Sequence, residues 1–334
     1  MPREPQFDER STAILRKSFY ASLPLPSALD PDFEDALRHI LSNPGSMVRP
    51  RMVQRVASAY GLDPEAAHNV AFALEYFHTA SLIFDDLPCM DDAVERRGVP
   101  CVHVQFGEAS AILSALALIN RAYALVWRAV ADAPRERRHA VMEYVEKRLG
   151  IEGILNGQSL DLRYAKLPHT QETTERIAHG KTVSLIRLTL LLPAMLGGAP
   201  VREVQLLERM AVCWGLGYQI LDDLKDVLQD AADTGKTAAR DELLDRPNIA
   251  RAIGVCGAVE RLEKLMRIGD QTLRRLLLHR PQLSFLSQLR TDLESELREV
   301  TDSALRNSSV HERSLLEICG APELAEKTAQ SKRS

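Results

Sequence analysis

Apolar residues recur along the chain at intervals of three and four positions, from about residue 10 onward. Because a helix completes a turn in about 3.6 residues, this spacing places the apolar side chains on one helical face. Runs in which β-branched residues alternate with polar ones are missing, so no strand pattern competes. The pattern predicts helices nearly throughout the chain, on the order of ten or more.

Short breaks separate these apolar segments. They read "LPLPSALDP" at 23–31, "NPGS" at 43–46, "DAPRER" at 132–137, "LPHTQE" at 167–172, "GGAP" at 197–200, "DRPN" at 245–248 and "HRPQ" at 279–282. None of them is long enough to link two domains. We therefore predict a single all-α domain over residues 1–334, with a core at about 10–320 and short disordered ends.

Composition indicates an ordinary globular chain. Hydrophobic residues make up 45% and charged residues 26%, and the net charge of -4 gives no indication of a nucleic-acid partner. The five cysteines are scattered without a Cys-x-x-Cys pair, which argues against a disulfide framework and a structural zinc site. The N-terminus lacks a signal-peptide core, and no stretch reaches about 18 uninterrupted apolar residues. We expect no membrane span and a cytoplasmic location.

Two acidic clusters stand directly behind apolar runs. The first lies in "SLIFDDLPCMDDAVERRG", residues 81–98, and the second in "GYQILDDLKDV", residues 217–227. In the second cluster Asp222 and Asp226 are four positions apart and share a helical face, with Asp223 beside them. Such a face repels itself unless a positive charge lies over it.

The first cluster has a different spacing. Asp85 and Asp91 are six positions apart, which a regular helix would place on different sides. Pro88 lies between them and is expected to distort the helix end, so that Asp91 can turn toward Asp85. One acidic cluster alone would be read as a solvated helix end. Two such clusters predict a clamp in which a hard divalent cation, Mg²⁺ above all, holds a diphosphate.

Cationic residues near these clusters could contact such a diphosphate. Arg96 and Arg97 follow the first cluster, Lys181 lies in "HGKTVSL", and Lys236 lies in "DTGKT". Arginine suits phosphate by its planar fork and lysine by its point charge. Neither Gly-Lys-Thr triplet is a nucleotide-binding loop, because the glycine required five positions earlier is an acidic residue in both.

The motifs resemble those of the trans-isoprenyl diphosphate synthases. The resemblance rests on "HTASLIFDDLPCMDDAVERRGVPCVHVQFGE", "GQSLDL", "GKTVSL", "GYQILDDLKDV" and "DTGK", which occur in the expected order over about residues 40–250. Within that family the chain is most like the bacterial geranylgeranyl diphosphate synthases. The resemblance implies an isoprenoid-synthase bundle around a deep central cavity and a homodimer. It also implies three Mg²⁺ ions per active site, or Mn²⁺ in their place.

The resemblance also assigns site residues. It implies metal binding by Asp85, Asp86, Asp91, Asp222 and Asp226, with Asp223 and Lys181 as further catalytic residues. It implies that the allylic diphosphate is bound by Arg96, Lys181, Thr182, Gln219 and Lys236, and isopentenyl diphosphate by Arg49, His78 and Arg97. A lone histidine at position 78 would otherwise be read as a core residue.

The implied reaction joins isopentenyl diphosphate to dimethylallyl, geranyl or farnesyl diphosphate. Metal ions and cationic side chains stabilise the leaving diphosphate as the allylic carbon–oxygen bond breaks. The isopentenyl double bond attacks the carbocation, and a proton is then lost to the departing diphosphate. An apolar cavity must keep water from the cation, which explains why apolar helices lead into acidic ends.

The residues before Asp85 bear on product length. Ala80 and Ser81, one turn earlier, leave the cavity open where a bulky side chain would stop a farnesyl chain in this family. Tyr76 and Phe77 lie one more turn up, about 5 Å along the axis, and could form the floor after one further addition. We predict a C20 product, geranylgeranyl diphosphate. A C15 or longer product, and packing of the two rings elsewhere in the core, stay open.

Two motifs depart from the family pattern. In "GSMVRP", residues 45–50, Ser46 stands in place of the isopentenyl-binding lysine, and Arg246 in "DRPN" stands in place of another lysine. Loss of one cation predicts weaker isopentenyl diphosphate binding unless another residue, such as Arg51, compensates. The loss also leaves open a terpene cyclase that uses the allylic substrate alone. No aspartate is lost, which argues against a non-catalytic subunit.

Overall fold

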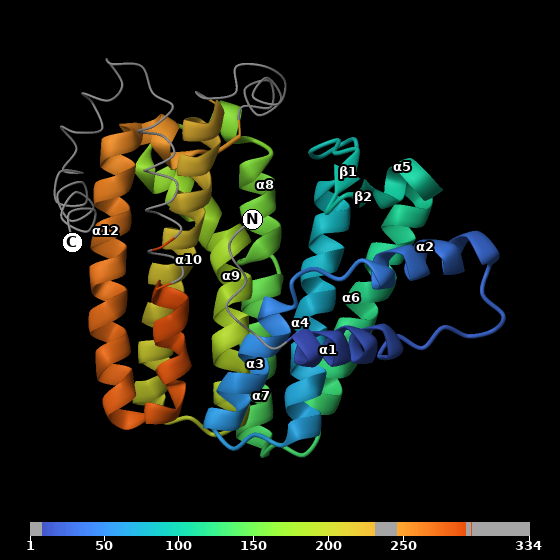
Figure 1. Ribbon diagram of the computed structural model, residues 1–334, viewed down its shortest axis with the longest axis horizontal. Helices are drawn as coiled ribbons and strands as arrows, with labels where there is room; N and C mark the ends of the chain where they lie inside the picture. The colour runs from blue at the N-terminus through green and yellow to red at the C-terminus, as the bar shows by residue number, and fades with distance from the viewer. Residues whose placement is uncertain (1–8, 231–245, 292–294, 296–334) are drawn as a thin grey trace, which may run out of the picture.

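The structure is a computed structural model that describes residues 9–230, 246–291 and 295, and the described chain is almost entirely helical (Figure 1). Its α-helices are α1 (Glu9–Ala21), α2 (Pro31–Ser42), α3 (Val48–Ala59), α4 (Pro64–Asp85), α5 (Val102–Phe106), α6 (Glu108–Val130), α7 (Arg135–Leu149), α8 (Ile154–Asp161), α9 (Gln171–Leu196), α10 (Val201–Asp230) and α12 (Ile249–His279). Two 3₁₀ turns, η1 (Tyr164–Lys166) and η2 (Pro281–Phe285), complete the helical elements. The predicted all-α class is confirmed.

One small sheet was not predicted. Strands β1 (Glu95–Arg96) and β2 (Val99–Pro100) form an antiparallel pair after the first acidic cluster. Each strand has two residues, which is too short for an alternating pattern to be recognised in the sequence.

The helix ends follow from local chemistry at the predicted breaks. Asp30 caps α2 by accepting the Phe33 N–H at 3.1 Å, and Asp63 caps α4 by accepting the Ala66 N–H at 2.9 Å. Proline follows each of these aspartates, at a position where a helix has no use for its N–H. The chain therefore starts its helices where polar caps and prolines stand between apolar runs.

The long helices form an upright bundle, while α1 and α2 run across it beside α4 and α6 (Figure 1). One cluster of buried side chains surrounds α4 and α6, and a second surrounds α10 and α12. Helix α9 contributes to both, with Leu188 and Leu192 in the first and Leu190 and Leu191 in the second. Helix α9 therefore lies between the two clusters and packs against both.

Helices α8 and α9 touch at two glycines. A Cβ atom on Gly157 would lie 2.4 Å from the Lys181 backbone nitrogen, and one on Gly180 would lie 2.7 Å from the Gly157 Cα. No heavier residue fits either position without moving a helix. This close approach places the middle of α8 beside the middle of α9.

Two further features bear on the sequence predictions. Among the described helices, α6 alone is long and apolar enough to cross a membrane by length and composition, and it packs along α4 in the core. Among the described residues, Cys89, Cys101 and Cys213 are free thiols. Cys256 in α12 is disulfide-bonded, which the scattered cysteine positions did not predict.

Candidate active site

The first acidic cluster folds back on the end of α4. The helix ends at Asp85, and the Asp91 N–H donates to the Asp85 carbonyl at 2.9 Å. Asp92 adopts a left-handed backbone conformation, with φ 49°, and its N–H donates to the Leu87 carbonyl at 3.0 Å. The chain around Pro88 thus returns Asp91 to the neighbourhood of Asp85.

Asp86 faces the hairpin rather than the open end of the helix. Its side chain is 5% exposed, and Arg96 donates from Nε to Asp86 Oδ1 at 2.7 Å. Arg96 belongs to β1, so the small sheet positions the guanidinium beside the first motif. This contact holds the Asp86 carboxylate against the hairpin.

Lys181 of α9 connects two carboxylates. Its Nζ lies 2.8 Å from Asp161 Oδ2 and 3.7 Å from Asp85 Oδ2. Burial raises the pKa of Asp85 to about 6, and Lys181 opposes that rise. Burial also acts to lower the pKa of Lys181, but Asp85 and Asp161 outweigh it and the pKa is raised. The ammonium group therefore stays charged between the two acids.

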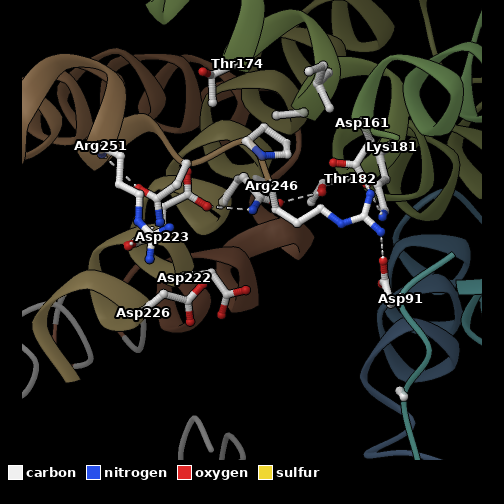
Figure 2. Close-up of a pocket in the computed structure, with 16 residues that line it drawn as sticks. Asp91, Asp161, Thr174, Lys181, Thr182, Asp222, Asp223, Asp226, Arg246 and Arg251 are labelled. Atoms are coloured by element: carbon white, nitrogen blue, oxygen red, sulfur yellow. Dashed lines mark hydrogen bonds and ion pairs between the residues drawn. The ribbon is translucent and has the colours of Figure 1, made fainter. Parts of the chain in front are cut away.

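Arg246 reaches the first cluster from the segment that leads into α12. It donates from Nη2 to the Met90 carbonyl at 2.9 Å and forms an ion pair with Asp91. Its Nη1 lies 3.9 Å from Asp161 Oδ2. Figure 2 shows Arg246 extended across the cavity toward Asp91.

The aspartates of the second cluster face different surroundings. Asp222 and Asp226 are exposed and line the cavity, whereas Asp223 is 3% exposed. Asp223 accepts the Ile249 N–H at 2.7 Å and the Gln219 side-chain N–H at 2.9 Å. Burial raises the pKa of Asp223 to about 7, and these hydrogen bonds oppose the rise. Asp223 thus holds the start of α12.

One cavity of about 430 Å³ is lined by Asp91 of the first cluster and by the three aspartates of the second, whereas Asp86 and Arg96 line a separate hollow. Figure 2 shows Asp222 and Asp226 on one side of the cavity and Asp91 on another. Its polar lining includes Asp91, Asp161, Lys181, Thr182, Gln219, Asp222, Asp223, Asp226, Arg246, Asn248 and Arg251. Thr182 donates to Gln219 Oε1 at 2.7 Å, which joins α9 to α10. Lys236 lies outside the described residues.

A second cationic region lies on the other side of α4. Glu75 is 2% exposed, burial raises its pKa, and Arg49 and Arg97 act against that rise. Burial lowers the pKa of His78 well below its ordinary value, and the nearby Arg49, Arg97 and Arg96 act in the same direction. His78 is therefore neutral and can donate a hydrogen bond. Arg49 and Arg97 both affect the pKa of His78, so the three residues predicted to bind isopentenyl diphosphate lie near one another.

The four residues assigned to product length lie along α4. Ala80 is fully buried, and Ser81 donates from its hydroxyl to the His78 carbonyl at 2.8 Å. The Tyr76 hydroxyl donates to the Phe19 carbonyl of α1 at 3.0 Å, and the two rings lie 4.6 Å apart. The Phe77 ring packs 5.0 Å from that of Tyr123 of α6. The two rings therefore point toward different neighbouring helices.

Three further residues join the site without having been assigned a role from sequence: Asp161, Arg246 and Glu75. Asp161 stands in the "GQSLDL" motif and Arg246 in place of a family lysine, so a signal existed for both. Glu75 gave no signal, because an acid inside an apolar helix identifies no partner. Within residues 9–230 and 246–291, no three His, Cys, Asp or Glu side chains already converge on a metal position.

Comparisons with known proteins show which family the chain resembles. The polyprenyl synthetase family model matches residues 30–266. Geranylgeranyl pyrophosphate synthase 11, chloroplastic, of Arabidopsis thaliana is 34% identical over 291 residues, which cover 82% of this chain and 80% of the relative. Geranylgeranyl pyrophosphate synthase 9, chloroplastic, of the same plant is 35% identical over 269 residues, covering 79% and 74%.

Solved structures are similar over most of their length. An FPP/GFPP synthase from Zymomonas mobilis has a TM-score of 0.68 at 28% identity, covering 87% of this chain and 96% of that chain. A geranyltransferase from Helicobacter pylori, complexed with magnesium and isoprenyl diphosphate, has a TM-score of 0.71 at 25% identity, covering 88% and 96%. With the family match over residues 30–266, these likenesses show that the chain belongs to the polyprenyl synthetase family.

Proposed function

We propose that this protein is a Mg²⁺-dependent trans-prenyltransferase that joins isopentenyl diphosphate to an allylic diphosphate and releases geranylgeranyl diphosphate. The observation that carries the proposal is one cavity lined by Asp91 of the first cluster and by the aspartates of the second. Lys181 and Arg246 also line it, and they pair with Asp85 and Asp91 respectively. The names of the Arabidopsis relatives support the product.

The residues around the cavity fit magnesium by their chemistry. Mg²⁺ prefers carboxylate oxygens and keeps waters and substrate phosphates in its remaining positions. We propose that Asp85, Asp86, Asp91, Asp222 and Asp226 hold it, with three ions per site. When bound, the metal neutralises charge on the leaving diphosphate. The magnesium-bound Helicobacter pylori structure supports the choice of metal.

The cations of the cavity bind the allylic diphosphate in this proposal. Lys181 is held by Asp85 and Asp161 and stays charged, so it can turn to a phosphate oxygen. Arg246 is poised in the same way between Asp91 and Asp161. Arg96, Thr182, Gln219 and Lys236 keep the allylic roles that the family resemblance implied. Charge-assisted contacts of this kind favour departure of the diphosphate.

Isopentenyl diphosphate is bound by Arg49, His78 and Arg97 in this proposal. Neutral His78 donates a hydrogen bond, while the two arginines supply charge. The isopentenyl double bond attacks the allylic carbon as the carbon–oxygen bond breaks, and the proton goes to the departing diphosphate. The growing chain lies along the apolar surface of α4, where Ala80 leaves room for a C20 product.

We also propose a homodimer and a cytoplasmic location. Helix α6 carries a row of exposed apolar side chains, comprising Ile112, Leu113, Leu116, Tyr123 and Trp127. A patch of this kind is unusual on a monomer, and a second copy of the chain would cover it. The family resemblance also fits a dimer.

Incubation of the purified protein with Mg²⁺ and farnesyl diphosphate, with and without isopentenyl diphosphate, tests the proposal. We expect a C20 diphosphate only when isopentenyl diphosphate is present, and no product after the metal is removed with EDTA. A hydrocarbon formed without isopentenyl diphosphate would identify a cyclase instead. No product in either reaction would contradict the prenyltransferase assignment.

A further inference from the structure

The turn that lacks the family lysine is surrounded by arginine side chains. Its carbonyl groups accept hydrogen bonds from three different guanidinium groups. Arg97 Nη1 donates to Asn43 at 3.3 Å, Arg16 Nη2 donates to Gly45 at 3.4 Å, and Arg51 Nη2 donates to Ser46. A carbonyl carries only partial charge, so a diphosphate is a stronger partner for any guanidinium that can leave its carbonyl.

Arg51 is not able to leave. Its side chain is 6% exposed, and it also donates to the Thr12 hydroxyl at 2.9 Å and to the Met47 carbonyl at 3.3 Å. Removing it from these partners would leave buried polar groups unpaired. Arg51 therefore joins α1 to the turn, and it is not the cation that compensates for Ser46.

Arg16 and Arg97 flank the turn from two sides. The Arg97 guanidinium lies so close to the backbone that a Cβ on Gly45 would be 2.6 Å from its Nη2. Asn43 borders two hollows, a small one lined by Arg97 and a cavity of about 670 Å³ lined by Arg16. The two guanidiniums are thus separated by the backbone of a single turn.

Helix α1 fixes the position of Arg16. Leu15 and Phe19 are 5% and 1% exposed, so they anchor the apolar face of the helix in the core. Thr12, one turn before Arg16, accepts the hydrogen bond from Arg51. Arg16 itself is exposed, so its long side chain can change direction while the helix stays in place.

We propose that Arg16 supplies the positive charge that is missing at position 46, where Ser46 stands in place of the family lysine. Its guanidinium leaves the Gly45 carbonyl and binds the diphosphate of isopentenyl diphosphate together with Arg97. The inference rests on the proposed function, because it adds a residue to the proposed isopentenyl diphosphate site. It places a binding residue of that site on the first helix of the chain.

Substitution of Arg16 tests the proposal. We expect Arg16→Ala to raise the KM for isopentenyl diphosphate about tenfold and to leave the KM for farnesyl diphosphate unchanged. Arg16→Lys retains the charge and should restore most of the affinity. Lys17→Ala is the matched control, because Lys17 carries the same charge one position later and has no hydrogen bond to the turn among the described contacts.

A second substitution separates binding from a general loss of structure. Ser46→Lys in the Arg16→Ala background should return the KM for isopentenyl diphosphate to the wild-type range, since it restores a cation on the same turn. Equal effects of Arg16→Ala and Lys17→Ala, or failure of Ser46→Lys to rescue, would overturn the proposal.

Calorimetric titration of each variant with isopentenyl diphosphate distinguishes this inference from the proposed function. If the wild type forms product and Arg16→Ala binds as tightly as the wild type, the function stands and the role of Arg16 falls. If the wild type forms no product but Arg16→Ala still weakens binding about tenfold, the function falls and the role of Arg16 stands. Absence of binding by the wild type overturns both.

Discussion

Burial and neighbouring arginines keep the pKa of His78 well below its ordinary value of 6.5. In the unfolded chain His78 takes up a proton near pH 6.5, whereas in the folded protein it does so only at lower pH. The unfolded state therefore binds more protons as the pH falls below 6.5, and unfolding becomes easier. As far as His78 is concerned, the free energy of unfolding has its full value above pH 6.5 and decreases as the pH falls below 6.5.

This sign gives a prediction for His78→Gln. Between pH 7.5 and pH 5.5 the free energy of unfolding should fall less steeply in the variant than in the wild type. The two slopes should differ by at most about 1.4 kcal/mol per pH unit. Urea unfolding at the two pH values measures the slope. His139→Gln, at an exposed position of α7, is the control. Equal slopes for both variants and the wild type would contradict the depressed pKa.

Lys181 offers a second prediction at the scale of one residue. Lys181→Met removes the ammonium group between Asp85 and Asp161. We expect kcat/KM for farnesyl diphosphate to fall about 10-fold to 100-fold, as for loss of a charge-assisted hydrogen bond. Initial rates at saturating isopentenyl diphosphate measure it, with the exposed Lys166→Met as the control. A rise confined to the KM for isopentenyl diphosphate would place Lys181 in the other site.

At the scale of elements, the contact between α8 and α9 determines where Asp161 meets Lys181. Gly157→Ala adds a Cβ that would overlap the backbone of α9. We expect a loss of about 1–3 kcal/mol in stability, because two helices must separate. The KM for farnesyl diphosphate should rise as well. Thermal unfolding and kinetics check both, and Ser159→Ala on the exposed side of α8 should change neither.

Helix α4 carries the prediction on product length. Ala80 is fully buried one turn before the aspartates, so Ala80→Tyr should shorten the space available to the growing chain. We expect the ratio of C15 to C20 products to rise, as measured by chromatography of the dephosphorylated products. Ala80→Ser keeps the side chain small and should leave the ratio unchanged. An unchanged ratio in Ala80→Tyr would reject the role assigned to this position.

The helices were predictable because their signals are local. Proline and cap residues at positions such as Asp30 and Asp63 define helix starts without reference to the rest of the chain. The partners of Arg246 were not predictable, since Asp91 lies 155 positions away and only the packed bundle brings the two together. Likewise, sequence spacing places Asp223 beside the face shared by Asp222 and Asp226, but it does not show that the fold exposes Asp222 and buries Asp223.

At the scale of the whole molecule, the exposed face of α6 carries the prediction of a homodimer. Leu113 and Trp127 are 55% and 61% exposed, and acidic residues there should prevent a second copy from covering the face. We expect the wild type to have about twice the chain mass of 37.2 kDa in light scattering, and Leu113→Asp/Trp127→Asp to have the single mass. Ile14→Asp, on the exposed side of α1, is the control. A monomeric wild type would refute the dimer.

The contact between Asp223 and the start of α12 ties the second aspartate cluster to the docking of α12. Asp223 accepts the Ile249 N–H, and Asn248 donates to the Asp223 carbonyl at 2.9 Å, so the end of α10 is fixed only when α12 has docked. A partly folded chain with α10 formed and α12 detached would possess every aspartate of the second cluster. We expect this partly folded chain to bind Mg²⁺ more weakly than the native protein. During refolding, the recovery of Mg²⁺ affinity would therefore report when α12 docks.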